Sequence, residues 1–238
     1  MSNDVDDLGA IGMKTKMRLT IYSLVACVLH AVILHSPFND YLYTSAFKVI
    51  VFLLCPILYF KATKEGSFKE LLSLFSMNGD KKNIKLAFSL GFGVFAVIVV
   101  VFMILRPFLD NAMIADALAE NGITPNNAIF VFLYIVVINA ALEQLFFRGF
   151  VFMSLYRMNV KRYAYVYSSL LFSLYHIPIL YNALSPSMLI LCTVGLVVAG
   201  LIFNALTVRF NSISGSLIVH ISANFALNLM IGVFFVFA

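Results

Sequence analysis

Charged residues are scarce in this chain. Asp, Glu, Lys and Arg make up 11% of its 238 residues, whereas about 25% is usual in soluble domains. The hydrophobic share is 62%, so too little polar surface remains to cover a globule in water. The scarcity of charge therefore excludes an ordinary soluble domain and predicts that a bilayer is the solvent.

Cysteine is also sparse, and the signatures of several protease classes are missing. Cys27, Cys55 and Cys192 lie in separate apolar runs without CxxC spacing, which favours buried free thiols. There is no Gly-x-Ser-x-Gly segment for a serine nucleophile and no His-Glu-x-x-His segment for a zinc protease. The formal net charge of +5 is not gathered on one segment, so we expect no nucleic-acid partner.

Long apolar runs are abundant. A transmembrane helix needs about 20 mostly apolar residues, and seven segments meet this requirement: 18–35, 43–62, 84–106, 127–156, 161–182, 187–208 and 213–237. The predicted fold class is all-α, a polytopic membrane helical bundle of about seven transmembrane helices, with eight as the alternative count. Apolar residues at helical spacing in 68–75 and 113–118 predict short interfacial amphipathic helices. We expect one membrane domain over 1–238.

Lys and Arg occur only in alternate loops. The loops 36–42, 107–126 and 183–186 contain neither residue. The positive-inside rule then predicts a cytoplasmic N-terminus and an external C-terminus, which agrees with an odd number of spans. The basic residues at the other, cytoplasmic, ends are Lys14, Lys16, Arg18, Lys64, Lys69, Lys81, Lys82, Lys85, Arg157, Lys161, Arg162 and Arg209.

Several polar residues interrupt the last four spans. Ionisable groups there cost at least ~2.5–3.5 kcal/mol on insertion scales and therefore indicate function. None of these residues is Asp, which excludes an aspartyl dyad. In the first three spans we expect Lys48 to extend toward the membrane surface and His30 to pack in the interior. The polar set of the last four spans is Glu143, Gln144, Arg148, His176, His220 and Asn224.

These polar residues lie at matching depths. At about 1.5 Å per residue, Glu143 and His176 are each roughly 21 Å from the basic end of their span. His220 and Asn224 are roughly 16 and 22 Å from theirs, and they share one helix face as an i, i+4 pair. Gln144 is also four residues from Arg148, so these two are expected to pair. One shared site near the middle of the membrane is the simplest interpretation.

Three motifs resemble those of a known family. The segment 143–149, Glu-Gln-Leu-Phe-Phe-Arg-Gly, resembles the Glu-Glu-x-x-x-Arg motif of the CAAX protease and bacteriocin-processing (Abi) family. The segment 172–176 resembles its Phe-x-x-x-His motif, and 220–224 resembles its His-x-x-x-Asn motif. All three follow the family's order, and the resemblance covers a core of about 127–230.

The resemblance implies a glutamate-dependent intramembrane endopeptidase without a cofactor, acting on a membrane-associated peptide or protein. By this carry-over Glu143 and His176 activate a water molecule, and His220 and Asn224 donate hydrogen bonds to the tetrahedral oxyanion. Gln144, Arg148 and Phe172 have supporting positions. Bacterial members of the family suggest a plasma-membrane location and substrates such as a bacteriocin precursor.

The departure from the family pattern is Gln144, where a second Glu is usual. It keeps open an alternative function, a catalytically impaired member that acts as a membrane scaffold or bacteriocin-immunity protein. A second alternative concerns chemistry, because one Glu and two His can also bind zinc with an open position. The family resemblance favours water activation without a metal.

Overall fold

The computed structural model describes residues 2–37, 40–76 and 81–236, and every regular element in them is a helix. Residue 237 of the last predicted span and residues 38–39 of a predicted loop lie outside the described residues. The elements are α1 (Ser2–Leu34), α2 (Tyr41–Thr63), α3 (Phe68–Ser73), α4 (Lys81–Leu105), η1 (Arg106–Phe108), α5 (Asn111–Glu120), α6 (Ala128–Leu133), η2 (Tyr134–Asn139), α7 (Ala140–Glu143), η3 (Gln144–Met153), α8 (Ser154–Arg157), α9 (Lys161–Leu180), α10 (Pro186–Phe210), α11 (Ile213–Ile231) and η4 (Gly232–Val236).

Six helical segments in the described part of the chain are long and apolar enough to cross a membrane. They coincide with six of the seven predicted spans, and the chain is an integral membrane protein of all-α fold. The exception is α9, which is 20 residues long but carries several Tyr and Ser residues. Its serines Ser168, Ser169 and Ser173 are buried inside the bundle. The predicted total of seven spans therefore remains a prediction.

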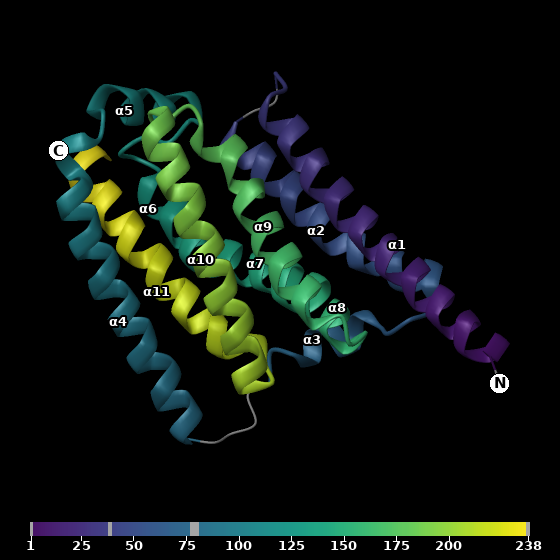
Figure 1. Ribbon diagram of the computed structural model, residues 1–238. Coiled ribbons are helices and arrows are strands. Elements are labelled where there is room, and N and C mark those ends of the chain that lie inside the picture. Colours follow the sequence, from purple (N-terminus) through teal and green to yellow (C-terminus); the bar gives the residue numbers. More distant parts are fainter. Residues whose placement is uncertain (1, 38–39, 77–80, 237–238) are drawn as a thin grey trace.

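The ends of the bundle differ in charge. The turns that connect α8 to α9 and α10 to α11 lie at the same end as α3 and the start of α4, and α1 begins at this end (Figure 1). These are the segments that carry the basic residues named above. The segment α5 and the connection from α9 to α10 lie at the opposite end (Figure 1). The basic turns named above therefore share one end of the molecule, whereas η1, which begins with Arg106, joins α4 to α5 at the opposite end (Figure 1).

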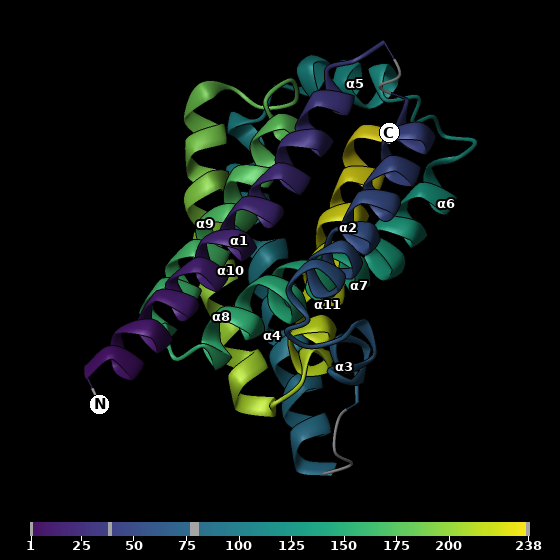
Figure 2. The same cartoon turned by 90° about the vertical axis from the view of Figure 1, so that its right-hand side faces the viewer.

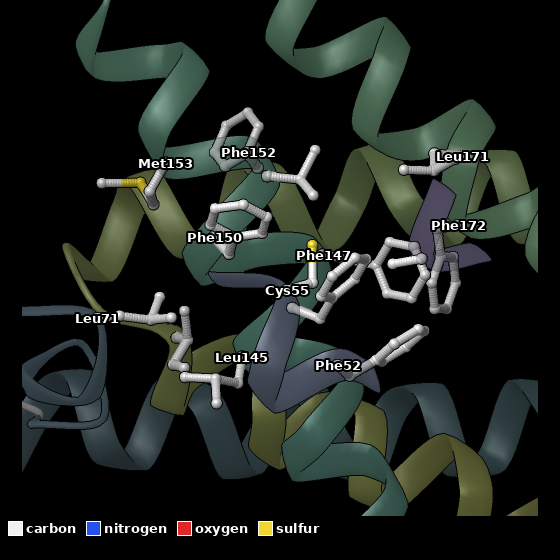
Figure 3. Close-up of a cluster of buried hydrophobic side chains, with 14 of the residues drawn as sticks. Phe52, Cys55, Leu71, Leu145, Phe147, Phe150, Phe152, Met153, Leu171 and Phe172 are labelled. Carbon is white, nitrogen blue, oxygen red and sulfur yellow. The ribbon is translucent and has the colours of Figure 1, made fainter. Parts of the chain in front are cut away.

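The core is aromatic and centres on η3. Every residue of η3, 144–153, is buried, and this element contacts α2, α3, α9, α10 and α11. The Phe52 ring stacks on Phe146 with centroids 4.1 Å apart, and Phe147 meets Phe172 edge to face at 5.3 Å. Figure 3 shows Phe52, Phe147 and Phe172 close to one another within this cluster. Such contacts hold α2 and α9 against the element that begins at Gln144.

Small residues bring α9 and α10 close together. A Cβ atom at Gly200 would lie 2.9 Å from the Cα of Ser169, so only glycine fits at this crossing. Asn204 then donates a hydrogen bond to the Ser169 hydroxyl at 3.1 Å. Close packing and interhelical hydrogen bonds of this kind stabilise helix pairs in lipid.

The fourth apolar run has an unusual helical register. It begins as α6 and then contains two π-helical stretches, η2 and η3, separated by the single α-helical turn α7. A π-helix bonds residue i to i+5 and is rare, and short π segments often occur at functional sites. Because each π turn holds more residues than an α-helical turn, the side chains that follow are rotated about the helix axis relative to an uninterrupted α-helix. In both views α7 lies about midway between the ends of the bundle (Figures 1 and 2).

Candidate active site

Glu143 is the last residue of α7 and is 2% exposed. Its Oε2 atom lies 3.9 Å from His176 Nε2 on α9 and 3.7 Å from His220 Nε2 on α11. Both distances exceed ordinary hydrogen-bond length. The structure thus brings together the acid and the two imidazoles that were expected to meet.

The two imidazoles are held differently. His176 Nδ1 lies 2.6 Å from the carbonyl oxygen of Phe172. A carbonyl oxygen only accepts, so Nδ1 carries the proton in this bond. In neutral His176 the Nε2 atom therefore presents a lone pair toward Glu143.

His220 has the opposite arrangement. Its Nδ1 atom lies 3.1 Å from Gln144 Nε2, and an amide NH₂ only donates. Nδ1 is therefore the acceptor, and the proton of neutral His220 sits on Nε2, facing Glu143. The Gln144 Oε1 atom accepts a 3.0 Å hydrogen bond from the Ser216 hydroxyl, so both ends of the amide are bonded.

Three other groups surround the second carboxylate oxygen, Oε1. Asn139 Nδ2 donates to it at 2.9 Å, and the Tyr175 hydroxyl donates at 3.3 Å. Lys48 Nζ lies 4.0 Å away and donates a hydrogen bond to Asn139 Oδ1. The carboxylate is thus held at Oε1, while Oε2 faces the imidazoles.

The expected pair of Gln144 and Arg148 does not form. The amide of Gln144 is used by His220 and Ser216, and none of the three guanidinium nitrogens of Arg148 has a hydrogen-bond partner among the described residues. Both ends of the Gln144 amide are already bonded to residues of α11, which leaves neither end for Arg148. The fully buried guanidinium instead lies 4.0 Å from the centre of the Phe172 ring, a cation–π contact.

Phe172 supports several members of the site at once. Its ring centroid lies 4.6 Å from that of His176 and 6.0 Å from that of His220, in both cases edge to face. Its side chain is 1% exposed. It therefore forms an apolar wall beside both imidazoles in addition to accepting the His176 hydrogen bond through its carbonyl.

Asn224 has a different environment from the other candidates. Its Nδ2 atom donates a 3.1 Å hydrogen bond to the backbone carbonyl of Ile135 in η2. It thereby ties α11 to the π-helical segment that precedes Glu143. No described contact joins Asn224 directly to Glu143, His176 or His220.

Sequence reasoning missed part of the site. Lys48 was expected to reach the membrane surface, but it is 7% exposed and points into the bundle toward Glu143. The available signal was the position of Lys48 inside an apolar run, where an ionisable group indicates function by default. His30 packs in the interior as expected, with its ring 5.1 Å from that of Tyr175.

The arrangement of the possible ligands bears on the zinc alternative. Within the part of the chain that the structure describes, no group of three His, Cys, Asp or Glu side chains is arranged to hold a metal ion. Each imidazole also uses its Nδ1 in a defined hydrogen bond. Independence from metal remains a prediction.

The fold and the site define a class: an integral membrane helical bundle with a buried glutamate that faces two histidines. Residues 125–226 match the family model described as type II CAAX prenyl endopeptidase Rce1-like. No curated protein and no solved structure matches the chain. The family match confirms the resemblance recognised from the three motifs, and it links this segment to CAAX-type proteases, which are hydrolases. It includes Glu143, Gln144, Arg148, Phe172, His176, His220 and Asn224, and it leaves α1, α2 and α4 outside.

Proposed function

We propose that this protein is a glutamate-type intramembrane endopeptidase that hydrolyses a peptide bond in a membrane-associated peptide or protein. The observation that supports it most is the Glu143 Oε2 atom, which lies within 3.9 Å of two imidazoles with opposite hydrogen-bonding polarity. One imidazole accepts a proton and the other donates one. Hydrolysis of an amide needs both functions.

In the proposed reaction a water molecule binds between Glu143 Oε2 and His176 Nε2. The water oxygen forms a bond to the scissile carbonyl carbon, while its proton passes to this acid–imidazole pair. The carbonyl oxygen becomes an oxyanion that accepts a hydrogen bond from His220 Nε2–H. When the C–N bond breaks, the proton held by the pair goes to the leaving amine.

Asn224 is proposed as the second oxyanion donor. An amide NH₂ carries two hydrogens, and its bond to the Ile135 carbonyl uses one of them. The other is available to an oxyanion near α11. We expect its contribution to be smaller than that of His220, because no described contact orients it toward Glu143.

The role of Gln144 argues against the catalytically impaired alternative. The loss of charge at this position does leave Arg148 without a hydrogen-bond partner among the described residues. The Gln144 amide itself is bonded to His220 at 3.1 Å and to Ser216 at 3.0 Å, and its nitrogen donates to His220 Nδ1, so that Nε2 carries the proton toward the substrate. A scaffold or immunity protein would not need this arrangement.

The match to CAAX prenyl endopeptidases also suggests the test substrates. The protein is purified in detergent and incubated with a prenylated peptide that ends in a Cys-aliphatic-aliphatic-X sequence, and with the same peptide lacking the prenyl group. Cleavage is followed by mass spectrometry. Glu143→Gln is expected to lower kcat by roughly 10²–10⁴-fold, the usual contribution of a general acid–base group.

The matched control is Glu120→Gln, which changes an exposed glutamate on α5. It should cleave as the unchanged protein does. Equal activity of Glu143→Gln and Glu120→Gln would refute the proposal. Removal of metal ions with a chelator is expected to leave the rate unchanged, and a loss restored by added zinc would instead support the metal alternative.

The proposed setting is a bacterial plasma membrane with the basic end of the bundle in the cytoplasm. The clustering of the basic turns other than η1 at one end supports this orientation through the positive-inside rule (Figure 1). A protease-accessibility assay on tags at the two termini tests it. The N-terminal tag should be cleaved only from the cytoplasmic side and the C-terminal tag only from outside.

A further inference from the structure

The segment that matches the family model begins at residue 125, but the site does not end there. Lys48, on α2, is 7% exposed and lies beside Glu143. An ionised lysine buried in a bundle is costly unless it is paired and hydrogen-bonded. The groups that Lys48 contacts should therefore explain why it is buried.

The partners of Lys48 form a chain with one direction. A lysine ammonium only donates, so in its hydrogen bond to Asn139 the amide oxygen accepts. That bond leaves the amide nitrogen of Asn139 pointing the other way, and it donates to Glu143 Oε1 at 2.9 Å. The ammonium itself is 4.0 Å from the same oxygen. Lys48 thus acts on the carboxylate both directly, by charge, and through Asn139.

The interactions of Lys48 and Asn139 are made with one oxygen of the Glu143 carboxylate. Both histidines face Oε2, whereas Lys48 and Asn139 face Oε1. Oε1 accepts hydrogen bonds from Asn139 and from Tyr175, so the carboxylate cannot rotate freely and its other oxygen keeps a fixed position. Positioning of this kind is a recognised source of rate enhancement in active sites.

We propose that Lys48 is a positioning residue of the active site, which acts through Asn139 and its own charge to hold Glu143 with Oε2 toward the two histidines. The inference rests on the proposed function. It makes α2, which lies outside the segment matched by the family model, a necessary part of the catalytic machinery. It also explains how a site with Gln144 in place of a second Glu contains a cation for its one acid.

The alternative is that Lys48 only joins α2 to the rest of the bundle. A purely structural lysine would affect the amount of folded protein and its thermal stability, but not the properties of Glu143. The two roles therefore predict different activities, and different properties of Glu143, for the correctly folded fraction of a Lys48 variant.

The test compares Lys48→Met, which keeps much of the side-chain volume, with Lys61→Met on the same helix, where the lysine is exposed. With the peptide that the unchanged protein cleaves, Lys48→Met is expected to lower kcat by about 10–100-fold, the range found for outer groups that orient metal ligands. KM should stay within about threefold, because Lys48 has no role in substrate binding. Lys61→Met should leave both constants unchanged.

A second readout does not depend on activity. Infrared difference spectra between each protein and the same protein with Glu143→Gln isolate the bands of the Glu143 carboxylate. These bands are expected to shift in Lys48→Met and to stay in place in Lys61→Met. If Lys48→Met does not yield folded protein, Asn139→Leu removes the relay and should give the same fall in kcat and a band shift.

Three results would overturn the positioning role of Lys48. Unchanged carboxylate bands in a folded Lys48→Met protein would overturn the positioning role, and so would a kcat within threefold of that of Lys61→Met. A rise in KM with unchanged kcat would assign Lys48 to substrate binding and likewise overturn it. If the unchanged protein cleaves neither peptide, the proposed function fails, but the infrared bands still decide whether Lys48 acts on Glu143.

Discussion

The two oxygens of the Glu143 carboxylate have different surroundings. Oε2 faces His176 and His220 at 3.9 and 3.7 Å, too far for direct hydrogen bonds. Oε1 accepts hydrogen bonds from Asn139 and Tyr175 at 2.9 and 3.3 Å. One side of the group is therefore held by the protein, and the other side is left to react.

The same division runs through the chain. The reactive side is built by His176 of α9 and His220 of α11, and both residues lie within the segment matched by the family model. The holding side includes Lys48 from α2, outside that segment. The three sequence motifs that identify the chemistry therefore do not include every residue that orients Glu143. Substitutions on the two sides should accordingly differ in the size of their effects.

The largest effects are expected on the reactive side. His220→Ala removes the proposed oxyanion donor and should lower kcat by roughly 10²–10³-fold. His176→Ala removes half of the proposed proton acceptor and should cost roughly 10²–10⁴-fold. Steady-state cleavage of the peptide measures both values.

The matched control for these two variants is His35→Ala, because His35 is an exposed histidine at the end of α1 whose ring stacks on Tyr181. It should retain the unchanged rate. A reactive-side variant that cleaves within threefold of this control would mean that Oε2 is not the reacting oxygen.

An intermediate effect is expected for Gln144→Glu, which restores the residue usual in the family motif. A carboxylate accepts, so it draws the proton of neutral His220 to Nδ1 and leaves Nε2 without one. We expect kcat to fall roughly tenfold, less than the ~10⁴-fold loss that a wrong histidine tautomer causes in a serine protease, because Asn224 is still available as a donor.

Nitrogen NMR of the labelled His220 ring provides a direct measurement, since its two nitrogen shifts report which atom carries the proton. The control, Asn159→Asp, changes an exposed amide to a carboxylate in the turn between α8 and α9. A gain in activity on Gln144→Glu would instead indicate that the natural chain is impaired, and would favour the scaffold or immunity function.

Much of the fold was predictable because lipid imposes a simple rule. Apolar runs of about 20 residues must become helices, and six of the seven predicted spans meet that description in the structure. The meeting of Glu143, His176 and His220 was also predictable. Distance along a helix is proportional to residue number, so residues at equal distances from the same membrane face lie in one plane.

The contacts of Gln144 and Lys48 could not be predicted, because they depend on how neighbouring helices pack and not on residue spacing along the sequence. The pairing of Gln144 with Arg148 was wrong because His220 and Ser216 on α11 bond the Gln144 amide, and spacing along one helix does not show which partners a neighbouring helix supplies. The position of Lys48 depended on which way α2 is rotated against η3, and a nearly uniform apolar helix gives little sign of its rotation. Contacts such as those of Phe52 with Phe146 and of Tyr59 with Phe150 hold α2 in the rotation that turns Lys48 inward.

The smallest effect is expected on the holding side, for Tyr175→Phe. The change removes one hydroxyl whose hydrogen bond to Oε1 is long, at 3.3 Å, and leaves the ring packing intact. A net hydrogen bond contributes about 0.5–1.5 kcal/mol, so kcat should fall by roughly two- to tenfold with KM unchanged. Tyr165→Phe is the control on the same helix, because the Tyr165 ring packs against Phe152, away from Glu143.

The size of this effect tests the division between the two oxygens. Asn139 and Lys48 remain in Tyr175→Phe, so Oε1 still has a hydrogen-bond donor and a nearby ammonium. The carboxylate should then keep its orientation, and Oε2 should continue to face both imidazoles. A loss as large as that of His220→Ala would mean that Oε1 takes part in the chemistry itself, and the distinction between a held and a reacting oxygen would have to be abandoned.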